Sequence, residues 1–297
     1  MTIKHIVLSG GGASGFTNYG ILKQLSKKKY LDVNTIESIH AISAGCIISV
    51  LFLLSNDWEE LDNYMIKRPW DKLFGIEPVK LLNIWQKKGI HDATLFYEIY
   101  KPFFKLKDLK AETTLLELYE LTGVEIIMYA TNINNDKLEK LVLSYKTYPN
   151  LEVYKAVAMS SAFPILFEPI FYDGKCIVDG GLLNNFPMNE CLQLNNNQKE
   201  ILGINLISGD VNFEKLDEET TLPLYFYQLI SNMHLLICNS NYKPTIDNII
   251  EHKIKNNGIS RWIECGNNEE VRKEYIDLGV ELADKYLNSK DFISKDL

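Results

Sequence analysis

Two strand–turn–helix units follow one another at the start of the chain, and this order limits the possible folds more than any other feature. Residues 3–9 (IKHIVLS) form an apolar run of strand length, and after a group of glycines apolar residues recur at helical spacing over residues 16–25. Residues 36–42 predict a second strand. Residues 46–54 predict a second helix, which is buried because it is apolar on every side. Two such units in succession indicate an α/β fold, with parallel strands and helices on both faces of the sheet.

The rest of the chain continues as helices and strands without a linker or a repeat. We expect a single domain over residues 1–290, with a motif-bearing part over about 3–210, a helical part over about 211–290 and a polar tail at 291–297. Asp173-Gly174 has the composition of a two-residue hairpin turn. The expected elements are mostly helix over 57–122, strands at 124–131 and 140–145, a helix at 151–162, a hairpin at 167–181, a strand at 200–208, and helices at 222–239 and 269–287.

Composition excludes several classes of function. The net charge of -8 argues against nucleic-acid binding, which depends on Lys and Arg neutralising phosphates. The five cysteines are scattered and include no C-x-x-C pair, so neither a disulfide framework nor a zinc site is indicated. The longest apolar run, Cys46 to Leu54, is far shorter than the ~20 residues that cross a bilayer, and the N-terminus leaves no room for a signal peptide. We therefore expect an intracellular protein, soluble or peripherally bound to membranes.

The loop after the first strand, GGGASG, satisfies G-x-G-x-x-G through Gly10, Gly12 and Gly15 and opens a helix. Such a loop can bind the phosphates of a dinucleotide with its backbone N–H groups. That function also requires an acidic residue at the end of the second strand, whereas Asp32 and Glu37 lie before that strand or at its start. The same row of N–H groups can instead stabilise the oxyanion formed when a nucleophile attacks an ester.

Ser43 follows the second strand in the sequence AISAGC and is the candidate nucleophile. Its neighbours Ala41, Ala44 and Gly45 are small enough for the strained strand-to-helix turn that exposes a catalytic hydroxyl. The simpler interpretation is a helix N-cap, since serine often satisfies the unpaired N–H groups at a helix start. The small neighbours and the glycine loop upstream favour the nucleophile.

A serine nucleophile needs a base, and the sequence offers two kinds. The first is a histidine, although none of the five has a distinctive loop setting; His252 follows Ser and Asp in the order of an α/β-hydrolase. The second is Asp179, which leaves a strand into Gly180 and Gly181 within VDGGLLNNFP. The simpler interpretation of an Asp-Gly pair is an Asx turn. The five histidines are His5 and His40 in or beside strands, His91 in the aromatic helical block, and His234 and His252 in or near C-terminal helices.

Together these residues resemble the patatin-like phospholipase family (patatin-like acyl hydrolases). SGGGASG is similar to the glycine-rich oxyanion loop of that family, AISAG to its G-x-S-x-G and DGG to its D-G-[GA], in the same order. The stretches MYATNIN, AVAMSSAFPILFEPI and VDGGLLNNFP extend the resemblance over about residues 3–190. It implies a three-layer α/β/α sandwich with a mostly parallel central sheet.

The resemblance also implies roles for individual residues. Ser43 matches the nucleophile and Asp179 the proton acceptor of a Ser-Asp dyad, so no histidine, metal or organic cofactor is required. The oxyanion hole would be formed by backbone groups of the glycine loop, above all Gly11, Gly12 and Ala13 within Gly10–Gly15, together with Ala44.

Two positions depart from the family pattern. Ser14 stands where the glycine loop usually carries Arg or Lys, so the loop must be held in another way. Ala41 replaces the first glycine of G-x-S-x-G, which is tolerable if the backbone there has a negative φ.

The sequence therefore predicts a serine acyl hydrolase acting on lipid esters, of the phospholipase A type. The alternatives are a catalytically silent patatin-like fold that binds lipid or a partner protein, motivated by Ser14 and Ala41, and a dinucleotide-dependent enzyme. The aromatic block 57–110, including Trp70 and Phe74, is either core packing, which base rates favour, or a lid that contacts a membrane peripherally. The sequence carries no indication of an oligomeric state.

Overall fold

The centre of the computed structural model is a mixed sheet of eight strands. The structure describes residues 2–55, 57–75, 78–195, 197–208, 215–240, 246–254 and 259–295. The strands of the sheet are β1 (His5–Leu8), β2 (Ser38–Ala41), β4 (Glu125–Asn132), β5 (Glu139–Leu143), β7 (Ile170–Tyr172), β8 (Lys175–Asp179), β9 (Ile201–Ser208) and β10 (Ile249–Ile254). Their order is β10-β9-β1-β2-β4-β8-β7, with β5 paired to β4 beside this path.

The sheet is mostly parallel. All neighbours from β10 to β4 pair in parallel, whereas β8, β7 and β5 add antiparallel pairs at the other side. Two further short strands, β3 (Gly89–His91) and β6 (Ile165–Phe167), form a separate parallel pair. The predicted α/β fold with a mostly parallel central sheet is confirmed.

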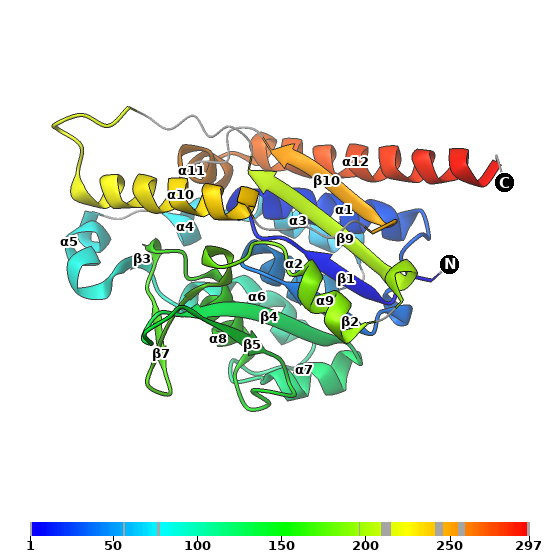
Figure 1. The fold of residues 1–297 in the computed structure, drawn as a ribbon, viewed down its shortest axis with the longest axis horizontal. Coiled ribbons are helices and arrows are strands. Elements are labelled where there is room, and N and C mark those ends of the chain that lie inside the picture. The colour runs from blue at the N-terminus through cyan, green and yellow to red at the C-terminus, as the bar shows by residue number, and fades with distance from the viewer. Residues whose placement is uncertain are drawn as a thin grey trace.

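Helices cover both faces of this sheet (Figure 1). Ile6 and Leu8 of β1 belong to the large core cluster that also contains the apolar residues of α1 and α2. Val7 points to the opposite face, where it packs with residues of α9. The helices are α1 (Gly15–Lys27), α2 (Ala44–Leu54), α3 (Trp58–Lys67), α4 (Asp71–Phe74), α5 (Pro78–Lys87), α6 (Thr94–Leu106), α7 (Leu115–Thr122), α8 (Val153–Ser161), α9 (Met188–Leu194), α10 (Leu222–Ser240), α11 (Ile259–Asn267) and α12 (Glu269–Lys295).

The long C-terminal helix α12 packs directly on α1 through two glycines. A Cβ atom added to Gly20 would lie 2.2 Å from the carbonyl oxygen of Ile276, and one added to Gly279 would lie 2.3 Å from that of Thr17. The two backbones therefore touch at this crossing. Because α1 begins at the glycine loop, the crossing also helps to fix where that loop lies.

Replacing Gly20 by alanine is expected to lower the free energy of unfolding by about 3 kcal/mol, because neither backbone can move away from the added methyl group. Thermal unfolding checks this, with Gly266→Ala as the control. The nearest atom to a Cβ at Gly266 is 3.9 Å away, which is an ordinary contact. Equal stability of the two variants would contradict the close approach.

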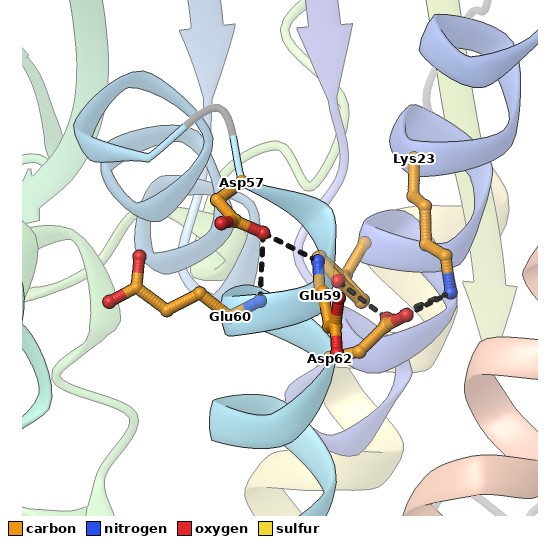
Figure 2. Close-up of polar contacts among 6 residues, drawn as sticks. Lys23, Asp57, Glu59, Glu60 and Asp62 are labelled. Atoms are coloured by element: carbon orange, nitrogen blue, oxygen red, sulfur yellow. Dashed lines mark hydrogen bonds and ion pairs between the residues drawn. The ribbon is translucent and has the colours of Figure 1, made fainter.

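Helix α3 is held against α1 by a small polar cluster (Figure 2). The Asp57 carboxylate caps α3 by accepting hydrogen bonds from the backbone N–H groups of Glu59 and Glu60, at 2.9 and 3.0 Å. Asp62 accepts from Lys23 Nζ at 2.7 Å and from the hydroxyl of Tyr19 on α1. This pairing positions the buried side of α3, which carries Met65.

Most elements predicted from the sequence are present, and the strands that were not predicted are β3, β6 and β10. His252 lies on β10, so it is near the C-terminal helix α11 but not in a helix. His91 lies on the short strand β3 and not on a helix. Asp173 and Gly174 have φ values of 48° and 70° and form the predicted hairpin turn. Helix α12 extends to Lys295, through most of the expected polar tail.

Candidate active site

Two loops meet at one edge of the sheet because β1 and β2 pair in register. Leu8 lies opposite Ala41 at the end of this parallel ladder. The glycine loop Gly10–Gly15 follows β1, and Ser43 follows β2. The carboxyl ends of parallel strands share one edge, so both loops open onto the same cavity.

Ser43 occupies a strained position between β2 and α2. Its φ of 52° and ψ of −124° lie in a region that glycine favours, as expected for a nucleophile on a sharp turn. Ser43 is the N-cap residue of α2, but its hydroxyl makes no capping hydrogen bond, so capping does not explain this serine. Its backbone N–H donates to Ser160 Oγ at 3.1 Å, and Ser160 donates to the carbonyl of Tyr129 at 2.6 Å.

Asp179 reaches Ser43 through the register of β4. Ala41 lies opposite Met128, and Asp179 lies opposite Ala130, two residues further along the same strand. The buried carboxylate accepts a hydrogen bond from the N–H of Gly181 at 2.7 Å. The Ser43 hydroxyl acts on the same carboxylate as a second hydrogen-bond donor. Burial raises the pKa of Asp179 from its ordinary 3.8 to about 6, and the two hydrogen bonds act in the opposite direction. Asp179 therefore forms the Asx turn of the simpler interpretation, and a hydrogen bond from Ser43 also acts on the same carboxylate.

The glycine loop adopts conformations that favour glycine. Gly11 and Gly12 have φ values of 151° and 55°. Ser14 Oγ donates to the carbonyl of Gly11 at 2.8 Å and is almost completely buried. At the position where the family pattern has a cation, the Ser14 hydroxyl thus holds the glycine loop by a hydrogen bond within the loop.

Ala41 is accommodated without strain. It is the last residue of β2, it is fully buried, and it is not among the residues with positive φ. The backbone at this position therefore has the negative φ that a methyl group in place of glycine requires.

The predicted site residues divide into those that line the cavity and those that support it. The lining residues are Gly11, Gly12, Ala13, Gly15, Ser43, Ala44 and Asp179. The supporting residues are Gly10, Ala41, Gly45, Gly180 and Gly181, which do not line it. A Cβ atom on Gly10 would lie 2.4 Å from Asn185 Oδ1, so this glycine serves close packing.

The cavity has a volume of about 190 Å³ and is mostly apolar. Its walls come from α2, α3, α4, α6, α10 and α11 as well as from the loops described above. No Lys or Arg side chain from the described residues lines it. Negative charge on a bound group would therefore be stabilised by backbone N–H groups and the start of α1.

Three polar residues at the site were not singled out from the sequence. Asn185 accepts a hydrogen bond from Gly10 N–H through its backbone carbonyl at 3.2 Å, and its side-chain amide donates to the carbonyl of Gly10 at 3.3 Å. Ser160 holds the backbone of Ser43. His234 of α10 lines the cavity. The run VDGGLLNNFP was the only signal for Asn185, and a serine inside a helix or a histidine among apolar residues carries none.

The histidines do not form a triad with Ser43. All five lie in the described part of the chain, and His234 alone lines the cavity. It interacts with the backbone of Gly181, and burial lowers its pKa to about 4, so the ring is neutral. His252 lies on β10 and does not line the cavity. Of the titratable side chains that line the cavity, Asp179 is the one on which a hydrogen bond from Ser43 acts.

The arrangement does not fit a dinucleotide site. Strand β2 ends at Ala41, and Ser43 occupies the position where a ribose-binding carboxylate would follow. Asp32 accepts a hydrogen bond from Asn34 before the strand, and Glu37 pairs with Lys4 at 3.2 Å. Among the described residues, no group of three or more His, Cys, Asp or Glu side chains is placed to hold a metal ion.

The sequence matches the family description "Patatin-like phospholipase" over residues 6–192, which include the glycine loop, Ser43 and Asp179. The chain belongs to this family. A probable lipid hydrolase, 463L of Invertebrate iridescent virus 6, is 30% identical over 199 residues, which cover 66% of each chain. The uncharacterized protein R571 of Acanthamoeba polyphaga mimivirus is 26% identical over 241 residues, 81% of this chain and 77% of the relative.

A solved structure has a similar fold. VipD from Legionella pneumophila aligns with a TM-score of 0.53 at 19% identity, covering 97% of this chain and 67% of VipD. At this identity the likeness concerns the fold alone. It agrees with the mixed α/β architecture described above, and the family and its relatives indicate a lipid hydrolase.

Ser160→Ala is expected to lower kcat/KM by roughly 10- to 100-fold and stability by about 1–3 kcal/mol, because it leaves the Ser43 N–H and the Tyr129 carbonyl unpaired in a buried place. Kinetics and thermal unfolding measure the two effects. Ser161→Ala is the control for stability, since Ser161 Oγ is buried without a hydrogen-bond partner. A Ser161 variant as unstable as the Ser160 variant would contradict this role.

Proposed function

We propose that this protein is a serine acyl hydrolase acting on lipid esters, of the phospholipase A type, with a Ser43–Asp179 dyad. One observation carries the proposal: the Ser43 hydroxyl, raised on a strained turn, meets a buried carboxylate beside a glycine-rich loop at an apolar cavity. An apolar cavity with few polar groups suits a lipid chain joined to a polar ester.

The reaction follows from these positions. Ser43 Oγ forms a bond to the ester carbonyl carbon while Asp179 takes the hydroxyl proton. Backbone N–H groups of Gly11, Gly12 and Ala13, with Ala44, stabilise the oxyanion. The intermediate collapses, the ester C–O bond breaks, and the leaving alcohol takes the proton. Water, deprotonated by Asp179, then attacks the carbonyl carbon of the acyl-enzyme. The bond from this carbon to Ser43 Oγ breaks, Asp179 returns the proton to Ser43 Oγ, and the fatty acid is released.

Labelling with a fluorophosphonate probe tests the nucleophile, because only an activated serine reacts with it. We expect covalent modification of the peptide that contains Ser43, found by mass spectrometry, and release of fatty acid from a panel of phospholipids and glycerides. An unlabelled Ser43, together with no product from any lipid, would mean that the proposal is wrong.

A catalytically silent lipid-binding protein is the second candidate, favoured by Ser14 at the position of the usual cation. The hydrogen bond from Ser14 Oγ to Gly11 holds the loop but supplies no positive charge. Lipid binding without labelling of Ser43 would support this candidate.

We also propose that the enzyme docks on a lipid surface through α10 and α5. Helix α10 contains no Asp, Glu, Lys or Arg. One of its sides lines the cavity with Tyr227 and His234, whereas the other exposes apolar side chains. The exposed side chains are Leu222, Tyr225, Phe226, Leu229, Met233 and Leu236.

Figure 1 draws helix α5 below one end of α10, and exposed apolar side chains continue onto α5. It packs on β3, α10 packs on β6, and β3 pairs with β6. Leu82 and Trp85 of α5 are 78% and 64% exposed. Residues 67–88 carry six basic and two acidic residues in a chain of net charge -8, which favours an anionic lipid surface. No helix among the described residues has the length and hydropathy to cross a bilayer.

Trp70 and Phe74, which the sequence suggested as membrane contacts, lie at the cavity instead. Trp70 is 3% exposed and stacks on Phe74, and both line the cavity. Core packing is therefore correct for this part of the aromatic block.

Vesicle flotation tests the docking surface. We expect wild type to float with vesicles that contain phosphatidylserine, and less with phosphatidylcholine alone. A Leu82→Ser/Trp85→Ser variant should lose most of this binding. Leu194→Ser is the control, because Leu194 is 66% exposed but lies on α9. Wild type that stays unbound, or a control that loses as much binding, would contradict the proposal.

A further inference from the structure

One face of α2 forms a continuous apolar wall of the cavity. Ala44, Ile47, Ile48 and Leu51 line the cavity from this helix. Their spacing of three, four and seven residues places them on the same side, one turn above another. The wall therefore starts beside Ser43 and runs along two turns of α2.

Buried side chains of α3 and α6 also line the cavity. Met65 of α3 and Phe96 and Ile99 of α6 line the cavity, and each is at most 2% exposed. Leu51 itself is 1% exposed. The part of the cavity along α2 therefore ends inside the core, and every side chain that lines it from α2, α3 and α6 is apolar.

The polar lining groups come from other elements. Ser161 ends α8, Ser231 and His234 belong to α10, and Asn185 follows β8. Ser161 Oγ is buried and has no hydrogen-bond partner. The apolar acyl chain of a bound ester would thus contact the α2 wall, and its polar alcohol portion would contact the groups from α8, α10 and the segment after β8.

Resting on the function proposed above, we infer that the α2 wall is an acyl-chain subsite and that Leu51 limits the chain length. Leu51 lies eight positions after Ser43, which is about 12 Å along a helix. An extended chain advances about 1.2 Å per bond, so this distance holds about ten carbons. The alcohol portion of the ester lies toward Ser161 and α10.

The cavity volume limits the subsite to one chain. Its volume of about 190 Å³ is below the 300–1,000 Å³ that is usual for ligand sites. One acyl chain of medium length enters along α2, and the described residues around the cavity leave no second space beside it for another chain. Longer chains have to displace buried core residues or remain partly outside.

A series of p-nitrophenyl esters from butyrate to palmitate, presented in a fixed excess of nonionic detergent, tests the subsite. We expect kcat/KM to be highest at about eight to ten carbons and to fall at least about tenfold at palmitate. Leu51→Phe should move the maximum to shorter chains, and Leu51→Ala should move it to longer chains. Rates of labelling by alkyl fluorophosphonates of graded length should follow the same order.

Leu54→Ala is the matched control. Leu54 lies on the same helix and is as buried as Leu51, but it does not line the cavity. This variant should lose stability and keep the wild-type chain-length profile. If Leu51→Ala is too unstable to assay, Leu51→Val should also move the maximum of kcat/KM to longer chains, with a smaller loss of stability.

The outcomes separate the subsite from the proposed function. Hydrolysis with a flat profile, or a profile that Leu51 variants do not move, overturns the subsite alone. A Leu54→Ala profile shifted as far as that of Leu51→Ala also overturns it. No hydrolysis and no labelling at any chain length overturns the proposed function, and the subsite with it.

Discussion

Replacing Asp179 by asparagine is expected to lower kcat/KM by roughly 10⁴-fold and to make the protein more stable at neutral pH. Asparagine cannot take the proton of the Ser43 hydroxyl. Its side-chain oxygen can still accept the hydrogen bond that Gly181 N–H donates at 2.7 Å. The substitution therefore removes the proposed base and leaves the turn after β8 in place.

The gain in stability follows from the direction of the pKa shift. Burial raises the pKa of Asp179 from 3.8 to about 6, so the folded protein holds this proton more tightly than the unfolded chain. Above about pH 6 the native state carries a buried charge, which costs about 3 kcal/mol of stability. Asp179→Asn should recover this amount at pH 8. The gain should shrink as the pH falls from 6 and disappear below about pH 4, where the carboxyl is protonated in both states.

Thermal unfolding at pH 8 and pH 4 measures the difference. The control is Asp173→Asn, because the Asp173 side chain is 77% exposed at the hairpin turn before β8. It should change neither activity nor stability by a measurable amount. Wild-type kcat/KM should also fall as the pH is lowered through about 6, since Asp179 must be ionised to act as base. An Asp179→Asn protein less stable than wild type at pH 8 would contradict burial as the cause of the shift.

The residues that could be predicted from the sequence are those whose chemistry depends on backbone shape. Glycines after one strand and a serine between small residues after the next are local signals, and parallel pairing brings them together. Asp179 depends on a longer path through β4 and β8, and the DGG sequence was its only local mark. These three motifs now lie at one cavity.

The missed parts depend on tertiary contacts that leave no local pattern. Ser160 lies near the end of α8 and has no sequence motif around it, yet its hydroxyl positions the backbone of Ser43. Helix α10 was predicted as a helix, but its apolar sequence does not indicate its surroundings; the structure exposes one side of it and turns the other to the cavity. Strand β10 is short and contains Glu251, His252 and Lys253, so its pairing with β9 outweighs weak strand propensity.

The family pattern also predicted a difficulty that the fold resolves. Ser14 removes the usual cation from the glycine loop, and the sequence alone could not indicate what holds the loop in its place. The Ser14 hydroxyl bonds to the carbonyl of Gly11, and Asn185 bonds to Gly10 from the segment after Asp179. The loop is therefore held through hydrogen bonds of neutral groups at both Gly10 and Gly11.

Removing the Ser43 hydroxyl is expected to reduce kcat/KM by at least about 10⁴-fold, and the choice of replacement should decide the effect on stability. Ser43 has a φ of 52°, which alanine retains at the same cost and glycine adopts freely. Both variants lose the donor that lowers the pKa of Asp179, so this effect is equal in the two. Ser43→Gly should therefore unfold at a higher temperature than Ser43→Ala, by the equivalent of about 1 kcal/mol after the greater flexibility of glycine in the unfolded chain is included. Equal unfolding temperatures would mean that the turn stores no strain, and residual hydrolysis above a tenth of wild type in either variant would remove Ser43 as the nucleophile.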